Sequence, residues 1–290
     1  MWVLFSILGA FSDTIRDVLQ KRNTTKYNPI IAGFSLSFYG SLVCIPFLLL
    51  FGVPEIKAGY WGAVVVLAIC GSLWPILFSY ALSHDNLSNL VPLLALNPIM
   101  TTLAVVIFDH KTPSVLGWAG IVLVFVGLYL SRFDKDLFKT KGILFPLIHV
   151  FSSMSGLSMV GVGLCWSIGA VAANIIIHTS SALFYIPTSA LSSAILSFFV
   201  VLIFERSFFR KMFSLSWHMI PFSLIHLVSE FSVGMALSTG FLPYVASIKR
   251  SAIIGSTIAG VVIFKEKISM FNAFGVFTTF IGVVTIIISR

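Results

Sequence analysis

Residues Leu242–Glu266 read LPYVASIKRSAIIGSTIAGVVIFKE, an apolar run of helix length with Lys249 and Arg250 side by side inside it. A helix rises about 1.5 Å per residue, so in a helix that crosses a bilayer these cations lie about 10 Å from Pro243, inside a hydrocarbon core about 30 Å thick. Each costs roughly 2.5 to 3.5 kcal/mol there and is tolerated where it faces a bundle interior or a wet cavity. Either the pair snorkels or meets a carboxylate for structural reasons, or it lines a pathway for a negative or strongly polar substrate.

The composition of the whole chain is that of a membrane protein. Its 290 residues are 58% hydrophobic and 10% charged, with a mean hydropathy of +1.04, whereas soluble domains carry about 25% charged residues. The net charge of +8 comes largely from Lys and Arg residues, which lie in short clusters between the apolar runs. Basic residues in such loops set the orientation of a membrane protein in the bilayer, which explains the positive charge. We therefore expect the lipid bilayer, and not nucleic acid, as a partner.

Ten apolar segments each have about the 20 residues that a helix needs to cross a bilayer. They are residues 2–20, 29–51, 59–82, 87–108, 113–131, 156–177, 182–204, 217–239, 243–264 and 269–288. Continuous apolar runs with interior Gly and Pro are typical of helical spans, and the alternation of a β-barrel is absent. The expected fold class is an all-α integral membrane protein with ten transmembrane helices.

The chain also contains signs of an internal duplication. A shift of about 155 residues superimposes three pairs of features, which are Ala81–Ser83 on Ala236–Ser238, Gly120 on Gly275 and Gly127 on Gly282. Each half would contain five spans. Because five is an odd number and the linker is short, the second half must enter the membrane from the opposite side. The sequence therefore predicts inverted five-helix repeats at 1–131 and 156–290, joined by a basic, interfacial segment at 132–155. Such repeats place a binding site at the midplane between them, with alternating access.

Charged residues of the first and eighth spans are candidates for coupling or ion pairing. Asp13 and Asp17 lie on one helical face with Arg16, within reach of its guanidinium. They form either a self-satisfied salt-bridge cluster or a cavity lining in which a carboxylate exchanges a proton. His226 and Glu230 lie one turn apart, and either hydrogen-bond to neighbouring helices or serve the cavity. Glu230 is also a candidate counter-ion for Lys249 or Arg250, which is the rival to a substrate role for that pair.

The remaining substrate-binding candidates are aromatic or amide side chains inside predicted spans. Together with Lys249, Arg250 and His226, they are Trp74, Asn97, Asn174 and Tyr244. The alternative for Trp74 is a lipid-facing position, and for the amides it is hydrogen bonding between helices. No nucleophile and base pair, phosphate-binding loop or set of metal ligands stands out, so we expect no enzyme activity, catalytic residue, cofactor or metal.

The chain resembles the EamA-like type of the drug/metabolite transporter superfamily over nearly its whole length. The resemblance is most specific at Val261–Ser269, VVIFKEKIS, which is followed by Gly275 and Gly282 and is similar to the family's apolar helix, acidic turn and final glycine-containing helix. The first half departs from this pattern with His110 where the second has Glu266. The Lys-Arg pair is also similar to one in the ninth helix of the triose-phosphate translocator branch, where it contacts substrate phosphate.

These observations predict a secondary active transporter, an exporter or exchanger, of a small polar metabolite in the cell inner or plasma membrane. The Lys249 and Arg250 pair favours an anionic substrate. The alternatives are a passive channel or facilitator and a membrane scaffold that transports nothing. Coupling to a proton or to a counter-substrate is open, as is the choice between a monomer and a homodimer.

Overall fold

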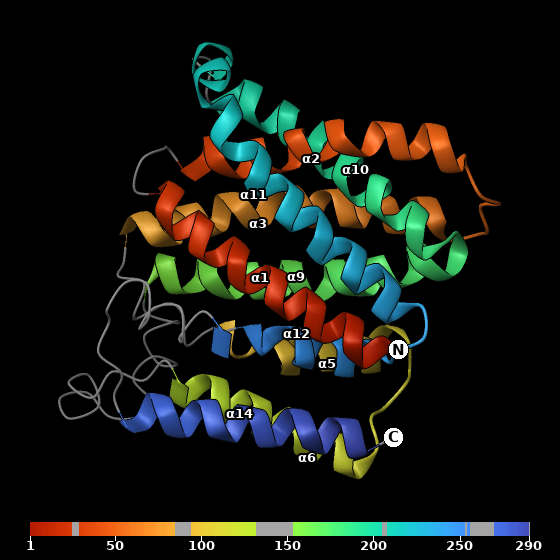
Figure 1. Ribbon diagram of the computed structural model, residues 1–290, viewed down its shortest axis with the longest axis vertical. Coiled ribbons are helices and arrows are strands. Elements are labelled where there is room, and N and C mark those ends of the chain that lie inside the picture. Colours follow the sequence, from red (N-terminus) through yellow and green to blue (C-terminus); the bar gives the residue numbers. More distant parts are fainter. Residues whose placement is uncertain are drawn as a thin grey trace. The chain divides into compact units, whose positions relative to one another are not determined.

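The computed structural model describes residues 1–24, 29–84, 94–131, 153–204, 208–252, 254–255 and 270–289. These residues form ten helices and no strand (Figure 1). The helices are α1 (Trp2–Thr24), α2 (Pro29–Phe51), α3 (Tyr60–His84), α5 (Asn97–Phe108), α6 (Val115–Ser131), α9 (Met154–Thr179), α10 (Ala182–Phe204), α11 (Phe208–Leu237), α12 (Leu242–Arg250) and α14 (Met270–Ile288). The expected all-helical fold class is therefore confirmed for this part of the chain.

The helix bounds agree with several of the spans predicted from the apolar runs and differ at others. The predicted span 243–264 is helical as α12 only to Arg250 and is followed by a turn at Ser251, and the predicted span 217–239 belongs to a helix that already begins at Phe208. Residues 29–51 and 182–204 are helical over the predicted ranges, as α2 and α10. Among the described residues, four helices are long and apolar enough to cross a membrane, namely Tyr60–Phe78, Met154–Thr179, Ala182–Ile203 and Ile220–Leu237. Most of the predicted linker at 132–155, residues Val261–Ser269 and the start of the fourth predicted span lie outside the described residues.

The chain divides into two compact units. Unit 1 comprises Met1–Ile76 and Ile168–Gly240, and unit 2 comprises Leu77–Ser167 and Phe241–Arg290. Each unit therefore takes helices from both predicted repeats, and α3 and α9 are divided between the two units.

In unit 1, α1 packs against α11. The rings of Phe5 and Phe231 meet edge to face with their centroids 6.3 Å apart. Gly9 faces α11, because a Cβ at this position would make an ordinary van der Waals contact, 3.6 Å, with the Cβ of Ser232. This contact holds the polar face of α1 beside α11, where Ser229 and Glu230 lie.

The other helices of unit 1 meet through aromatic and hydroxyl side chains. α2 packs against α10, where the rings of Phe34 and Phe198 lie 6.4 Å apart. α3 meets α10 at its first residue, because the hydroxyls of Tyr60 and Thr188 are hydrogen-bonded at 2.7 Å. These contacts fix α10, and with it Tyr185, within unit 1.

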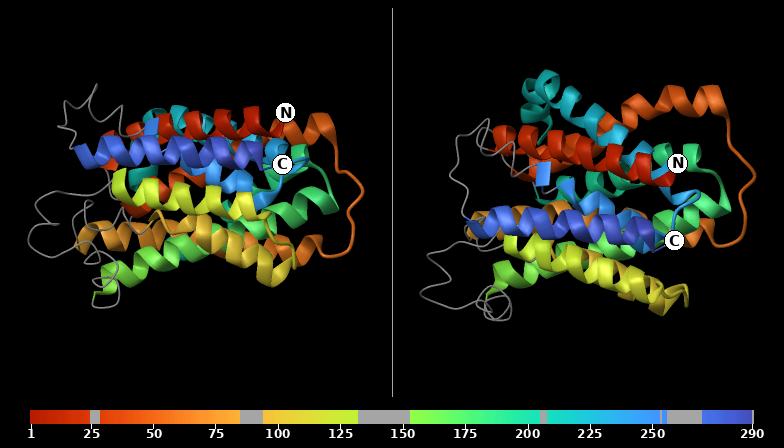
Figure 2. Two further views of the ribbon diagram at one scale, coloured as in Figure 1. Left: turned by 90° about the horizontal axis from the view of Figure 1, so that it is seen from below. Right: turned by 60° about the horizontal axis from the view of Figure 1, so that its bottom comes forward.

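In unit 2, α6 and α14 form a close antiparallel pair, and Figure 2 shows them side by side in both views. A Cβ on Gly127 would meet the backbone nitrogen of Thr279 and would lie 2.8 Å from the carbonyl oxygen of Gly275. A Cβ on Gly282 would lie 2.6 Å from the backbone nitrogen of Val124 and 2.9 Å from the carbonyl oxygen of Gly120. Both glycines therefore allow backbone to pack on backbone, as small residues do between membrane helices.

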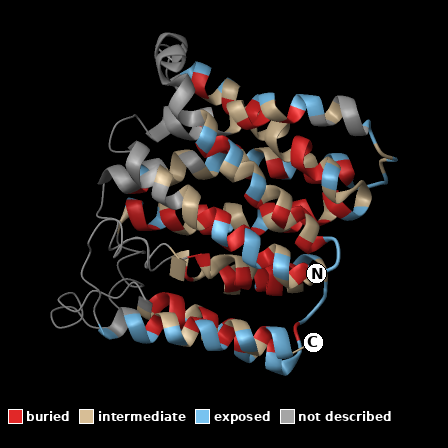
Figure 3. Cartoon of the chain, in the orientation of Figure 1, coloured by how far each residue is buried: buried red, intermediate tan, exposed pale blue. Residues whose placement is uncertain are grey.

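The opposite face of α14 is apolar and exposed. Gly275, Thr279, Gly282 and Ile286 are buried at steps of three and four residues, whereas the side chains between them are partly buried or exposed. Figure 3 shows buried and exposed residues alternating along the helix. The exposed ones are large and apolar, namely Phe274, Phe277, Phe280, Ile281 and Val284. A helix that is apolar on its exposed face as well as its buried one is typical of a membrane span.

α5 and α12 also pack together in unit 2, and both are short. α5 begins at Asn97 after a turn at residues 95–96, and its second residue, Pro98, suits the first turn of a helix. α12 ends at Arg250, where the backbone N–H of Ser251 donates to the carbonyl oxygen of Ile248 at 3.0 Å. The first residue of one helix and the last residue of the other are both polar.

Candidate functional site

The predicted site residues fall into two groups, one in each unit. Unit 1 contains Asp13, Arg16, Trp74, Asn174, His226 and Glu230, and unit 2 contains Asn97, Tyr244, Lys249 and Arg250. The side chain of Asp17 lies outside the described residues.

Arg250 and Asn97 are in direct contact in unit 2. Nε of Arg250 donates to Oδ1 of Asn97 at 2.7 Å. Asn97 is buried and Arg250 is partly buried. A cation in the last turn of a helix is also favoured by the carbonyl groups at that end, which supports the position of Arg250 at the end of α12. Two of the predicted substrate contacts are therefore joined by a hydrogen bond.

Trp166 of α9 covers one face of the Arg250 guanidinium. The carbon Cζ of Arg250 lies 4.1 Å from the centre of the indole ring, within the range of a cation–π contact. Trp166 was not among the site residues predicted from the sequence. Its position 84 residues before Arg250 gives no local signal, because a cation–π partner is selected by tertiary packing rather than by spacing along the chain.

Asn97 is held by α9 on its other side. Its Nδ2 donates to the carbonyl oxygen of Gly163 at 3.3 Å and to Oγ of Ser167 at 3.1 Å. The hydroxyl of Thr101, one turn further along α5, donates to the same Ser167 Oγ at 3.1 Å. Asn97, Thr101 and Ser167 are each no more than 2% exposed, so every polar atom of this network must find a partner within the protein. Ser167 and Thr101 were also missed by sequence reasoning.

Tyr244 and Lys249 lie on the same helix as Arg250, and their role as substrate ligands stays a prediction. The hydroxyl of Tyr244 accepts a hydrogen bond of 3.3 Å from the backbone N–H of Ser114. Gly117 leaves room for this ring, because a Cβ there would lie 2.7 Å from Cζ of Tyr244. These contacts tie the first turn of α12 to the start of α6. Lys249 is partly buried in the last turn.

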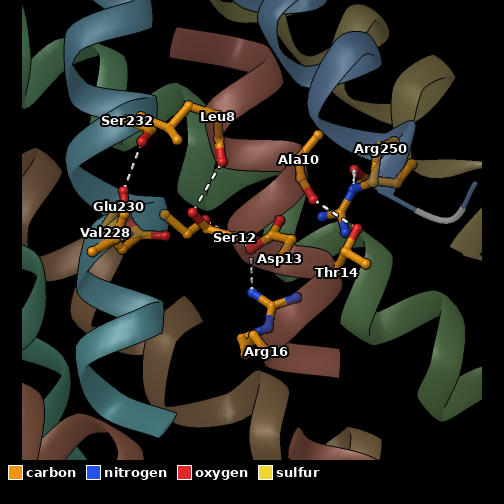
Figure 4. A network of polar contacts seen from close by, with 12 residues as sticks. Leu8, Ala10, Ser12, Asp13, Thr14, Arg16, Val228, Glu230, Ser232 and Arg250 are labelled. Carbon is orange, nitrogen blue, oxygen red and sulfur yellow. Dashed lines mark hydrogen bonds and ion pairs between the residues drawn. The ribbon is translucent and has the colours of Figure 1, made fainter. Parts of the chain in front are cut away.

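In unit 1, Asp13 and Arg16 form the predicted ion pair. Nη1 of Arg16 lies 2.8 Å from Oδ1 of Asp13 (Figure 4). The hydroxyl of Ser229 on α11 donates to the same carboxylate oxygen at 2.7 Å. Asp13 is 3% exposed, so the carboxylate is buried between α1 and α11. The pairing of Asp13 with Arg16 is thus confirmed, and Ser229 is an additional partner that the sequence did not identify.

Glu230 accepts a short hydrogen bond from the hydroxyl of Tyr185 on α10. His226 lies one turn before Glu230 on α11, and both side chains are partly buried. Trp74 is partly buried in α3, and Asn174 is 9% exposed in α9. The predicted pairing of Glu230 with Lys249 or Arg250 would join the two units and stays a prediction.

The described residues contain no group of three or more His, Cys, Asp or Glu side chains that could hold a metal ion. In unit 2, the described contacts of the Arg250 guanidinium are with the amide of Asn97 and the ring of Trp166. In unit 1, one carboxylate contacts a cation and a hydroxyl, and another contacts a phenol. Buried ionisable groups of this kind in membrane proteins commonly serve solute or proton pathways.

Comparison with known proteins agrees with the expected family. Residues 1–133 match the EamA-like transporter family, so the resemblance expected from the sequence is confirmed over that segment. Together with the long apolar helices, this match indicates a multi-pass membrane protein. The likeness to the triose-phosphate translocator branch stays a prediction. No curated protein matches the chain. A solved structure titled "Crystal structure of protein" covers 98% of this chain and 95% of its own, with a TM-score of 0.72 and 15% identity. At that identity the likeness shows a shared fold.

Proposed function

We propose that this membrane protein is a transporter of the drug/metabolite type, and that it works as a secondary active transporter, an exporter or exchanger, of a small polar metabolite with an anionic group. The observation that carries the proposal is the 2.7 Å hydrogen bond between Arg250 and Asn97. Both residues were identified separately from the sequence, and they meet where α12 ends and α5 begins. Interrupted helices that expose polar groups at depth are a common way to build a transporter site.

The neighbours of Arg250 in unit 2 support a role in binding an anion. Asn97 and Trp166 are both neutral, so neither of these contacts cancels the charge of the guanidinium. A cation inside a membrane protein is costly, and such residues commonly serve substrate or ion pathways. The partly buried Lys249 would add a second positive charge to the same region.

The proposed mechanism is alternating access around a midplane cavity between two inverted repeats. The register of α6 and α14 supports such a relation. Gly127 of α6 lies against Gly275 and Thr279 of α14. A shift of about 155 residues relates Gly127 to Gly282, and it relates Gly275 and Thr279 to Gly120 and Val124. Gly282 does lie against Gly120 and Val124, so the same contacts occur twice with the two halves exchanged. A two-fold axis perpendicular to two antiparallel helices produces this reciprocity. If the helices cross the bilayer, that axis lies in the membrane plane.

We propose residues 1–131 and 156–290 as the two repeats, with 132–155 as the basic linker and interfacial segment. The family match over residues 1–133 ends within a few residues of the first boundary and so supports it. The cell inner or plasma membrane is proposed as the location. Asp13, Arg16, Asp17 and Glu230 are proposed for coupling to a proton, and exchange against a counter-substrate is the alternative.

Transport by the purified full-length chain in proteoliposomes tests the proposal. The probes are radiolabelled succinate, glutamate and inorganic phosphate as anions and alanine as a neutral solute. We expect saturable uptake and counterflow of at least one anion, abolished in Arg250→Ala and Lys249→Ala proteins that still fold and insert. Wild-type rates in both variants would contradict the assignment. Flux without saturation or counterflow would favour a channel, and no flux of any probe would favour a scaffold.

A further inference from the structure

The guanidinium of Arg250 is held in two independent directions. Asn97 contacts Nε in the plane of the group, at 2.7 Å, and Trp166 covers one face at 4.1 Å from Cζ to the ring centre. A contact in the plane prevents the group from sliding, and a contact on the face prevents it from tilting. The two contacts together restrict the orientation of the guanidinium plane of Arg250.

The direction of the Asn97 amide is itself determined by α9. The carbonyl oxygen of Gly163 only accepts hydrogen bonds, so the group of Asn97 that faces it at 3.3 Å is the NH₂ group. Oδ1 must then face Arg250, which only donates. Ser167 Oγ accepts from Asn97 and donates to the carbonyl oxygen of Gly163 at 2.9 Å, which closes the network. The amide is therefore fixed with its acceptor toward the guanidinium.

This arrangement uses properties that arginine has and lysine lacks. A guanidinium is planar, stacks on aromatic rings and presents pairs of parallel N–H groups, whereas an ammonium is a compact point charge with rotating donors. Paired N–H groups match the two oxygens of a carboxylate or the adjacent oxygens of a phosphate. A site that attracted anions through positive charge alone would not require Trp166 or the fixed amide of Asn97.

We infer that Trp166 and Asn97 are positioning residues, which fix the plane of the Arg250 guanidinium so that the site selects solutes carrying a carboxylate or phosphate group over neutral solutes of similar size. The inference rests on the proposed function, since it concerns how the same site chooses its substrate. It adds a residue of α9 to the site and assigns the selectivity to the geometry of the cation as well as to its charge.

The test compares Trp166→Leu, Trp166→Phe and Arg250→Lys with the wild-type chain in proteoliposomes. Succinate and inorganic phosphate are the anionic probes, and alanine is the neutral probe. We expect Trp166→Leu to raise KM for the transported anion by about 3- to 30-fold, the range of a partly desolvated cation–π contact, with kcat changed by less than about twofold. Trp166→Phe keeps an aromatic face and should recover most of the affinity. Arg250→Lys keeps the charge and should still lose at least about tenfold in kcat/KM for the anion.

Trp61→Leu is the matched control, because Trp61 is 68% exposed on α3 and should leave all kinetic constants unchanged. The inference would be overturned by an unchanged anion KM in Trp166→Leu or by wild-type kinetics in Arg250→Lys. Loss of transport in Arg250→Ala would still support the proposed function in that case. A fall in kcat for all probes, with unchanged KM and a lower melting temperature, would show that Trp166 is merely structural. If neither succinate nor phosphate is transported or raises the melting temperature of the wild-type chain, the selectivity is also overturned.

Discussion

Arg250, the last residue of α12, donates a 2.7 Å hydrogen bond from Nε to Oδ1 of Asn97, the first residue of α5. The contact joins two helix ends that are 153 residues apart in the chain. A charged donor and a neutral acceptor meet there in a region of low exposure, where hydrogen bonds to charged groups contribute about 1.5 to 3 kcal/mol. Changes at Asn97 therefore reveal whether the charge or the geometry of Arg250 matters.

We predict that Asn97→Asp impairs anion transport through its charge. The new carboxylate faces Arg250 and competes with the substrate anion, and it also loses the NH₂ group that donates to Gly163 and Ser167. kcat/KM for succinate should fall by about tenfold or more, as expected for the loss of one charge-assisted contact. Transport assays on the purified protein measure this fall. Thr285→Val, which removes a hydroxyl on α14 outside this network, is the control.

Asn97→Ala separates the charge effect from the loss of hydrogen bonds. It removes the contact with Arg250 but adds no negative charge, so its effect on kcat/KM for succinate should be smaller than that of Asn97→Asp. Equal losses in the two variants would mean that the structural network, and not competition for the guanidinium, explains the result.

We predict that Asp13→Asn destabilises unit 1. The side chain of Asn accepts from Ser229 as Asp13 does, but it no longer pairs with the guanidinium of Arg16, which is 15% exposed. Removing one partner of a buried ion pair costs about 3 to 5 kcal/mol. The melting temperature in detergent should therefore fall clearly. The double variant Asp13→Asn/Arg16→Gln should recover much of this loss, and no recovery would mean that the pair is not the source of the effect.

The sequence predicted helices such as α2 and α10 well, because each is an apolar run long enough to be recognised without a partner. It did not predict the turn at Ser251 that follows α12, because the apolar run continues past that residue. It also predicted contacts that are local, such as Asp13 with Arg16 at a spacing of three residues. Contacts between distant helices were not predictable individually. Glu230 accepts a hydrogen bond from Tyr185, and Arg250 lies over the ring of Trp166. Both contacts depend on how distant helices pack, and a single sequence contains no signal for them.

We predict that Glu230 couples transport to a proton gradient. Its carboxylate is held by the hydroxyl of Tyr185, which is 3% exposed, so a change of protonation at Glu230 would alter a contact between α11 and α10. Glu230→Gln should abolish uptake driven by an imposed pH gradient and leave counterflow intact, because exchange does not need net proton movement. Gradient-driven uptake at the wild-type rate in Glu230→Gln would remove Glu230 as the proton carrier.

We predict that Gly127→Ala and Gly282→Ala destabilise the α6–α14 pair to a similar degree. A Cβ at Gly127 would meet the backbone nitrogen of Thr279, and a Cβ at Gly282 would lie 2.6 Å from the backbone nitrogen of Val124, so in both cases backbone must move. Overpacking of this kind typically costs about 1 to 3 kcal/mol. If the two positions are equivalent under the repeat, their melting temperatures should fall by nearly equal amounts. Gly62→Ala is the control, because a Cβ there has no neighbour within 4 Å and alanine favours helix formation. A large fall in only one of the two variants would argue against the two-fold relation between α6 and α14.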